Sequence, residues 1–320
     1  MVSSRGATTR KGEGVAKAIL AINMCFLRKR WTEPEEWAEI IDEQLGLKYA
    51  EFSSDLLDPF FVPEPARSRI AEKTREVFES SAITITDYYT GLITHCLNLL
   101  SHPEPSIRDR AMEWCQEAIV LASQMGAGGV GGHFDTIAFL ECLDEKKRAA
   151  RIDGVIHAFQ SLSHDAKEHG LKFLLWEQMY TPNEAPYTIA EAKDIYERGN
   201  KGAAVPIYLT VDVGHTCNLH YPHSEKDLDP YLWLEKFAHI SPVIHIHQTD
   251  GKASQHWPFT DEYNKVGIIH PEKVLEAIEK SGSKMNYLMF EVFHSLGQTE
   301  EKIVDDLKRS IEYWRRWIAD

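Results

Sequence analysis

The stretch PVIHIHQTD (242–250) combines an apolar half with a half that ends on polar side chains. Its β-branched residues favour a buried strand. Because side chains alternate along a strand, His245 and His247 share one face, and Ile244 and Ile246 share the other. The stretch therefore predicts a buried strand that presents two histidines on one face.

Seven further apolar runs are spread along the chain. They are AILAINMCFL (18–27), LKYAEFS (47–53), AITIT (82–86), GGVGGHF (128–134), LKFLLWEQM (171–179), VPIYLTVDV (205–213) and NYLMFEVFH (286–294). Runs rich in Ile, Val, Leu and aromatic residues suit strands that are buried on both faces, as in a parallel sheet. We therefore expect eight strands.

Helix start signals lie between these runs. Thr32 and Glu35 have the spacing of a capping box, Asp229-Pro230 is typical of an N-cap followed by the first helical residue, and Thr299 precedes a run with helical periodicity. Eight strands that are each followed by a helix predict a single (β/α)8 barrel. An open doubly wound sheet is the alternative, although eight regular units are less usual there.

The size and composition of the chain agree with one large domain. It has 320 residues and 43% hydrophobic residues, which argues against disorder. No linker rich in Ser, Gly or Pro divides it. We expect a disordered polar tail over 1–16 and one barrel domain over 17–320.

Charge and cysteine content argue against several classes of protein. With 35 Lys+Arg against 49 Asp+Glu the formal charge is −14, which opposes binding to nucleic acid. No segment reaches the roughly 18 apolar residues that span a membrane. The 5 cysteines are scattered without a C-x-x-C pair, which argues against a disulfide framework or a cysteine zinc site. We expect a cytoplasmic protein without membrane contact, and a homo-oligomer is left open.

Four consecutive predicted strands end on side chains that bind metal ions. They are Glu177 in the fifth strand, Asp212 in the sixth, His247 in the seventh and Glu291 in the eighth. Active-site residues of barrels lie at these C-terminal strand ends. One such residue would more often be a helix cap or an ion-pair partner, but four in succession favour a metal centre. Oxygen ligands with one imidazole suit Mn²⁺ foremost, with Mg²⁺, Co²⁺ or Zn²⁺ as alternatives.

Position along the seventh strand distinguishes its two histidines. His247 lies nearer the C-terminal end of the strand and so nearer the barrel mouth, which makes it the better ligand. His245 lies one layer deeper, where we expect it to hydrogen-bond one of the side chains that ligate the metal.

This succession, with His215 following Asp212 and Asp250 following His247, resembles the xylose-isomerase-like TIM-barrel superfamily. Within it, the chain is most similar to the sugar (phosphate) isomerase/epimerase branch, which includes ketose 3-epimerases and hydroxypyruvate isomerase. The likeness covers nearly the whole chain after the tail and is strongest over 171–294. It implies a catalytic barrel that acts on a small polyhydroxy ketose or its phosphate.

The resemblance also implies roles for single residues. Glu177, Asp212, His247 and Glu291 would ligate one divalent cation, Glu177 and Glu291 would also serve as acid and base, and His215 would contact substrate. Two carboxylates on opposite sides of an enediolate plane can remove a proton from one face and return one to the other. That gives epimerisation, and return at the neighbouring carbon gives aldose–ketose isomerisation.

Further substrate-binding candidates lie in the predicted loops. Tyr89 and Thr90 follow the third strand and carry hydroxyls suited to a sugar, although an ordinary surface loop is about equally expected. His133 ends the fourth strand, and Trp257 is expected to cover the mouth. Lys252 is the cation near the seventh strand, where ketose 3-epimerases often carry an arginine, and a solvated lysine is the simpler interpretation.

Two patterns favour simpler interpretations. GAGGVG (126–131) matches G-x-G-x-x-G but includes a strand instead of opening a helix after one, so we expect glycines packed at the barrel wall rather than a dinucleotide site. His220 and His223 form an H-x-x-H pair in a loop, where exposed histidines are commoner than a second metal site.

The sequence also suggests a narrower substrate class and leaves two alternative functions open. The Thr-Gly loop and Gly-Gly-His strand resemble proteins that handle four-carbon tetrulose phosphates. An abasic-site endonuclease of the three-zinc type would need more ligands on the early strands, which offer Glu51, Asp55 and Asp87, and a basic groove that the charge of −14 opposes. A non-catalytic barrel that binds a metal or sugar would not need the paired Glu177 and Glu291.

Overall fold

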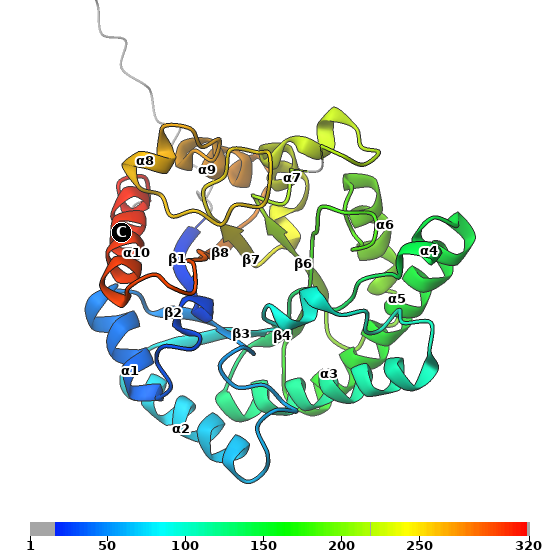
Figure 1. The fold of residues 1–320 in the computed structure, drawn as a ribbon, viewed down its shortest axis with the longest axis horizontal. Helices are drawn as coiled ribbons and strands as arrows, with labels where there is room; N and C mark the ends of the chain where they lie inside the picture. Colours follow the sequence, from blue (N-terminus) through cyan, green and yellow to red (C-terminus); the bar gives the residue numbers. More distant parts are fainter. Residues whose placement is uncertain (1–16, 218, 319–320) are drawn as a thin grey trace, which may run out of the picture.

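Eight parallel strands form a closed barrel in the computed structural model, which describes residues 17–217 and 219–318 (Figure 1). The strands are β1 (Lys17–Asn23), β2 (Tyr49–Ser53), β3 (Thr84–Tyr89), β4 (Gly129–Gly131), β5 (Phe173–Glu177), β6 (Ile207–Asp212), β7 (Val243–Ile246) and β8 (Met285–Phe290). Strands pair in chain order, and β1 closes on β8 with Ile22 opposite Phe290. The (β/α)8 prediction is confirmed and the open-sheet alternative is wrong. The tail predicted over 1–16 lies outside the described residues.

Helices surround the strands (Figure 1). They are α1 (Pro34–Glu39), α2 (Ala66–Ser80), α3 (Pro105–Met125), α4 (Phe139–Cys142), α5 (Glu145–Glu168), α6 (Ile189–Gly199), α7 (Pro230–Phe237), α8 (Asp261–Asn264), α9 (Pro271–Lys280) and α10 (Glu300–Arg315). Shorter turns are η1 (Met24–Leu27), η2 (Ile40–Gln44), η3 (Ile93–Cys96), η4 (Glu225–Leu228) and η5 (Ala238–Ile240). Arg315 Nη2 donates to the Gly46 carbonyl (2.6 Å), which ties the last helix to the first βα unit. In the described part of the chain, no helix is long and apolar enough to cross a membrane.

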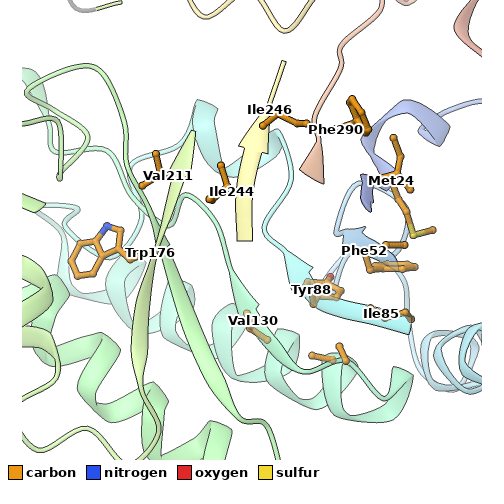
Figure 2. Close-up of a cluster of buried hydrophobic side chains, with 14 of the residues drawn as sticks. Met24, Phe52, Ile85, Tyr88, Val130, Trp176, Val211, Ile244, Ile246 and Phe290 are labelled. Carbon is orange, nitrogen blue, oxygen red and sulfur yellow. The ribbon is translucent and has the colours of Figure 1, made fainter. Parts of the chain in front are cut away.

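Side chains of each strand alternate between two environments. Trp176, Val211 and Ile244 are among those that face the helices, as Figure 2 shows. The intervening side chains point into the barrel, where Ala21, Leu175, Val243 and Met289 form a second, smaller apolar cluster. Two residues beyond Leu175, Val243 and Met289 the inward positions become polar, with Glu177, His245 and Glu291. The barrel therefore places a polar layer on an apolar floor, at the C-terminal ends of its strands.

The first strand is shorter than the apolar run 18–27 predicts. It ends at Asn23, whose side-chain Oδ1 accepts a hydrogen bond from the Cys25 N–H (2.8 Å) and caps η1. Met24 and Leu27 in that turn are fully buried. A buried helical turn has the same apolar composition as a strand, which explains the difference.

The third strand is longer than predicted. Residues 87–89 belong to β3, so the expectation of a loop there is wrong. Asp87 is tolerated inside the barrel because Thr86 Oγ1 donates to its carboxylate (2.7 Å). The register against β2 also shifts between Ala50 and Phe52, which disturbs the alternation that sequence patterns rely on.

The predicted helix starts agree with the structure, with one shift. Glu33 rather than Thr32 precedes the first helix, and the Glu36 carboxylate accepts the Glu33 backbone N–H (3.1 Å). Pro34 fixes this start because proline is tolerated only in the first turn. The starts after Asp229 and Thr299 are confirmed.

The glycines of 128–131 pack against neighbouring residues, which confirms the expectation of a tight barrel wall. A Cβ at Gly128 would lie 2.7 Å from the Thr86 carbonyl oxygen. One at Gly131 would overlap the Leu175 side chain and lie 3.1 Å from its Cα. β4 is glycine-rich because its neighbours occupy that space.

We expect Gly131→Ala to lower the free energy of unfolding by about 1–3 kcal/mol, because the added methyl overpacks the barrel wall. Gly154→Ala is the matched control, since Gly154 is exposed in α5 with nothing within 4 Å of its would-be Cβ. That control should be neutral or stabilise by up to about 1 kcal/mol. Urea unfolding of both variants measures the difference, and equal midpoints would contradict the tight wall.

Candidate active site

The polar layer of the barrel brings together four buried side chains from β5 to β8. Ligand atoms of Glu177, Asp212, His245 and Glu291 all lie within 4.8 Å of one another. His245 Nδ1 lies 3.0 Å from Glu177 Oε1 and 3.2 Å from Glu291 Oε2. It is 3.8 Å from Asp212 Oδ2. Three of the four predicted ligands therefore surround the imidazole that we expected to lie beneath them.

His245 also contacts an acid on its other side. Its Nε2 lies 3.0 and 3.1 Å from the two carboxylate oxygens of Glu51, which in turn accepts a hydrogen bond from Asn23. Although burial lowers it, the carboxylates of Glu51, Glu291 and Glu177 raise the pKa of His245 well above its ordinary value. An acid beside each ring nitrogen favours the protonated form of His245, in which both nitrogens can donate.

His247 lies next to one acid of this group rather than at its centre. Its Nε2 is 2.9 Å from Asp212 Oδ1. Its Nδ1 accepts the backbone N–H of His256 (3.0 Å) and lies 3.3 Å from the Gln248 carbonyl. Backbone groups of Gln248 and His256 thus hold Nδ1 of His247, and its Nε2 faces Asp212. Asp212, His247 and His256 form a second group whose ligand atoms lie within 4.8 Å of one another.

Several buried oxygens of this site lack a hydrogen bond among the described residues. They are Asp212 Oδ2 and both carboxylate oxygens of Glu291. Although burial raises it, His215 and His247 hold the pKa of Asp212 well below its usual value, so this acid is ionised. Burial raises the pKa of Glu291 to about 7. Buried carboxylate oxygens without a hydrogen bond are costly unless a cation or donor meets them, so these residues fit a divalent cation.

A cavity of about 220 Å³ opens above these acids. It is lined by Tyr89, Leu92, His95, Tyr180, His215, Ser254, His256, Glu291 and Phe293. Tyr89 donates its hydroxyl to Glu177 Oε2 (2.9 Å), and His215 Nδ1 lies 2.7 Å from the Gln178 carbonyl. Two predicted substrate-binding residues, Tyr89 and His215, therefore face the same space as Glu291.

Two other predicted residues lie in the wall instead of the cavity lining. Thr90 Oγ1 donates to the His133 carbonyl (2.8 Å), so its hydroxyl is used by the backbone. The His133 ring stacks on His95 (4.3 Å) and its Nε2 lies 3.5 Å from Glu184 Oε1. His95, His133 and Glu184 form a further group with ligand atoms within 4.8 Å of one another.

Trp257 and Lys252 also lie outside the cavity lining. The backbone of Trp257 exchanges two hydrogen bonds with that of Gln248, and its ring stacks on Tyr263 (4.9 Å). The Lys252 side chain is 77% exposed and lies 3.8 Å from Asp250. In the loop after β6, both histidines of the H-x-x-H pair are exposed.

Sequence patterns missed His256, which occupies the place expected for Trp257. Its ring stacks between His247 (4.0 Å) and Phe293 (4.1 Å), and its Nδ1 lies 3.0 Å from the Glu291 carbonyl. Its φ of +49° belongs to the left-handed region, which non-glycine residues seldom adopt. A loop residue such as His256 has no hydrophobic periodicity that would identify it in the sequence. The only available signal is its position in the loop that follows the histidine-bearing strand.

Comparisons with known proteins agree with this architecture. The family model described as xylose isomerase-like TIM barrel matches residues 40–317. A D-erythrulose 1-phosphate 3-epimerase from Brucella abortus is 25% identical over 297 residues, which are 92% of this chain and 94% of that protein.

Solved structures share the fold. A candidate xylose isomerase from Rhodospirillum rubrum has a TM-score of 0.85 and 24% identity, covering 93% of this chain and 99% of that one. D-psicose 3-epimerase from Clostridium cellulolyticum H10 has a TM-score of 0.68 and 14% identity, covering 94% of this chain and 100% of that one. At these identities the likeness establishes the barrel, and the chemistry depends on the site itself.

We expect Mn²⁺ to raise the melting temperature of the chelator-treated protein, because a cation that binds only the folded state stabilises it. Asp212→Asn should weaken Mn²⁺ binding by about 10- to 100-fold, since it removes a buried anionic ligand. The double variant His220→Ala/His223→Ala is the control and should bind as the wild type does. Titration calorimetry compares the three proteins, and undiminished affinity in Asp212→Asn would exclude this centre.

Proposed function

This chain belongs to the xylose isomerase-like TIM barrel family, and we propose that it is a divalent-metal-dependent isomerase or epimerase of a small ketose or ketose phosphate. The observation that carries the proposal is a pair of neighbouring buried carboxylates: Glu177 ends β5, and Glu291 follows β8 and lines the cavity. Burying two neighbouring carboxylates is costly, and a protein that only bound a sugar would not need them. Such a pair is typical of a catalytic site.

The cation would be held by the residues that the sequence predicts, Glu177, Asp212, His247 and Glu291. Mn²⁺ suits this mixture of oxygen and nitrogen donors best. When bound, the ion supplies Lewis-acid polarisation of the ketose carbonyl, which acidifies the neighbouring C–H. His245 already pairs with acids at both nitrogens, which favours a supporting role for it below the ligands.

Proton transfer would fall to the two glutamates. Glu177 is fixed by the Tyr89 hydroxyl (2.9 Å) and His245 Nδ1 (3.0 Å), which orient its carboxylate toward the cavity base. Glu291 has a pKa raised by burial to about 7, close to the value at which a general acid or base works best near neutral pH. One glutamate takes the proton from the carbon next to the carbonyl and the other returns a proton to the opposite face. The substrate gains and loses no atoms, and its stereocentre inverts.

The finer proposal is a four-carbon tetrulose phosphate as substrate. The Brucella relative is named for D-erythrulose 1-phosphate. A cavity of about 220 Å³ is small among ligand pockets, which favours a short-chain sugar. His215 and Tyr180 line its wall, so an imidazole and a phenol are available to hydroxyl groups of the substrate.

One observation favours a second candidate, an abasic-site endonuclease. The group of His95, His133 and Glu184 supplies further ligand-type side chains in the loops after β3, β4 and β5. The formal charge of −14 opposes it, because DNA binding needs a basic surface. Cleavage of an abasic duplex by the metal-loaded protein, without turnover of any ketose, would replace the first proposal with this one.

We expect the metal-loaded protein in D₂O to incorporate deuterium at a single carbon next to the carbonyl of its ketose substrate. Glu177→Gln and Glu291→Gln should each slow this exchange by about 10²- to 10⁴-fold, because each removes a proton carrier. Proton NMR of three- to six-carbon ketoses and their phosphates measures it.

The control for these variants is Glu197→Gln, which alters an exposed glutamate on α6. Metal content measured on each protein separates loss of the proton carrier from loss of the ion. Unchanged exchange in either active-site variant would show that the missing carboxylate takes no part in the reaction.

A further inference from the structure

A phosphate group on the substrate would need a positive partner that the cavity lining does not supply. Among the described residues that line the cavity, none is a lysine or an arginine. Burying a phosphate against carboxylates without a cation is costly, and arginine is the side chain that best matches its oxygens. An arginine immediately behind the lining would supply such a partner.

Arg28 occupies such a position at the β1–β8 side of the mouth. It follows η1, and its side chain is only 16% exposed. The guanidinium carbon lies 4.9 Å from the ring centroid of Phe293, which lines the cavity. Stacking on an aromatic face holds a guanidinium in one orientation and leaves the N–H groups at its edge able to donate.

The guanidinium of Arg28 keeps unused donor capacity. Its Nη1 lies 3.7 Å from Asp55 Oδ2, which is an ion-pair distance. The same Nη1 is buried and has no hydrogen-bond partner among the described residues. A buried guanidinium N–H without an acceptor is unusual and suits a ligand oxygen.

The loop after β3 fixes the acid beside Arg28. Asp55 accepts the Leu92 backbone N–H at 3.1 and 3.3 Å, and Leu92 lines the cavity. This contact needs Gly91, because its φ is +71° and a Cβ there would lie 2.7 Å from Asp55 Oδ1. Arg28 and Asp55 thus stand at a cavity edge made by Leu92 and Phe293.

The two neighbouring basic residues have other tasks. Lys29 Nζ donates to the Leu296 carbonyl (2.5 Å), and Arg30 Nη2 donates to the Ser295 carbonyl (3.1 Å). Both therefore fasten the loop after β8. Arg28 differs from them because its guanidinium lies over the ring of Phe293, a residue that lines the cavity.

The opposite side of the mouth would repel a phosphate. Glu184, with a side chain 12% exposed, lies beside His133 near β4 and β5, across the barrel from β1 and β8. Lys252 is the rival anchor, but its side chain is 77% exposed, whereas that of Arg28 is 16% exposed. Because Asp55 is already paired with Arg28, whereas Glu184 lies beside His133, the Arg28 side is the more favourable one for a phosphate.

We propose that Arg28, held over Phe293 and beside Asp55, is the phosphate subsite of this enzyme and selects ketose monophosphates over free ketoses. This rests on the proposed function and names its substrate class. The phosphate enters between Leu92 and Phe293 and accepts hydrogen bonds from the guanidinium, and the hydroxyl-bearing end of the sugar points toward β4 and β5.

Steady-state kinetics on a free tetrulose and its 1-phosphate test the subsite. Arg28→Met should lower kcat/KM for the phosphate by about 10- to 100-fold, mainly through KM, and leave the free ketose within about twofold. Arg28→Lys should keep part of the preference, which also shows that the position tolerates change. Lys226→Met, at an exposed lysine outside the cavity lining, is the charge-matched control and should behave as the wild type. An equal loss on both substrates, or a selective loss in Lys252→Met instead, overturns the proposal.

A binding measurement separates this subsite from the proposed reaction. Inorganic phosphate should bind the wild-type protein by calorimetry and bind Arg28→Met about tenfold or more weakly. If no ketose is turned over and this difference is found, the subsite stands and the reaction assignment fails. If ketoses are turned over and both proteins bind phosphate equally, the reaction stands and the subsite is wrong.

Discussion

The buried imidazole of His245 is the interaction on which the centre of this barrel depends. It lies 3.0 Å from Glu177 on one side and 3.0 Å from Glu51 on the other, and it is fully buried. Four carboxylates converge within the barrel, and an apolar medium strongly disfavours ionised acids that lack a counter-charge. A cationic His245 offsets part of that charge from below. The apolar layer of Leu175 and Met289 beneath it excludes water and so keeps the pairing strong.

The site is therefore divided into two levels with different tasks. The lower level, Glu51 with His245, balances charge and fixes the Glu177 carboxylate. The upper level, Asp212 and Glu291, carries buried oxygens that no hydrogen bond satisfies among the described residues and that suit a cation. This division explains why β7 and the residue after it supply two histidines: His245 and His247 are two residues apart, so they reach different depths. The role of each histidine thus depends on how deep in the barrel it lies as well as on its side-chain chemistry.

Much of this arrangement could be predicted from the sequence, because strands and their ends are local features. Alternating and continuous apolar runs located eight strands, and the acids that end them located Glu177, Asp212 and Glu291. Loop geometry could not be predicted in the same way. His256 takes the place expected for Trp257 because the backbone pairing of 248 with 257 turns the tryptophan outward, a long-range contact with no periodic signature. The hydrogen bond from the Thr90 hydroxyl to the His133 carbonyl is a long-range contact of the same kind.

The pairing of β1 with β8 has a consequence for how the protein is made. Glu51 near the start of the chain and Glu291 near its end both contact His245. A growing polypeptide on the ribosome would already contain the first acid long before the last strand is synthesised. Until that strand emerges, the sheet has open edges and its charged centre faces water. Assembly of the centre therefore waits until β8 has been made, and a fragment that stops before β8 lacks the Glu291 contact to His245.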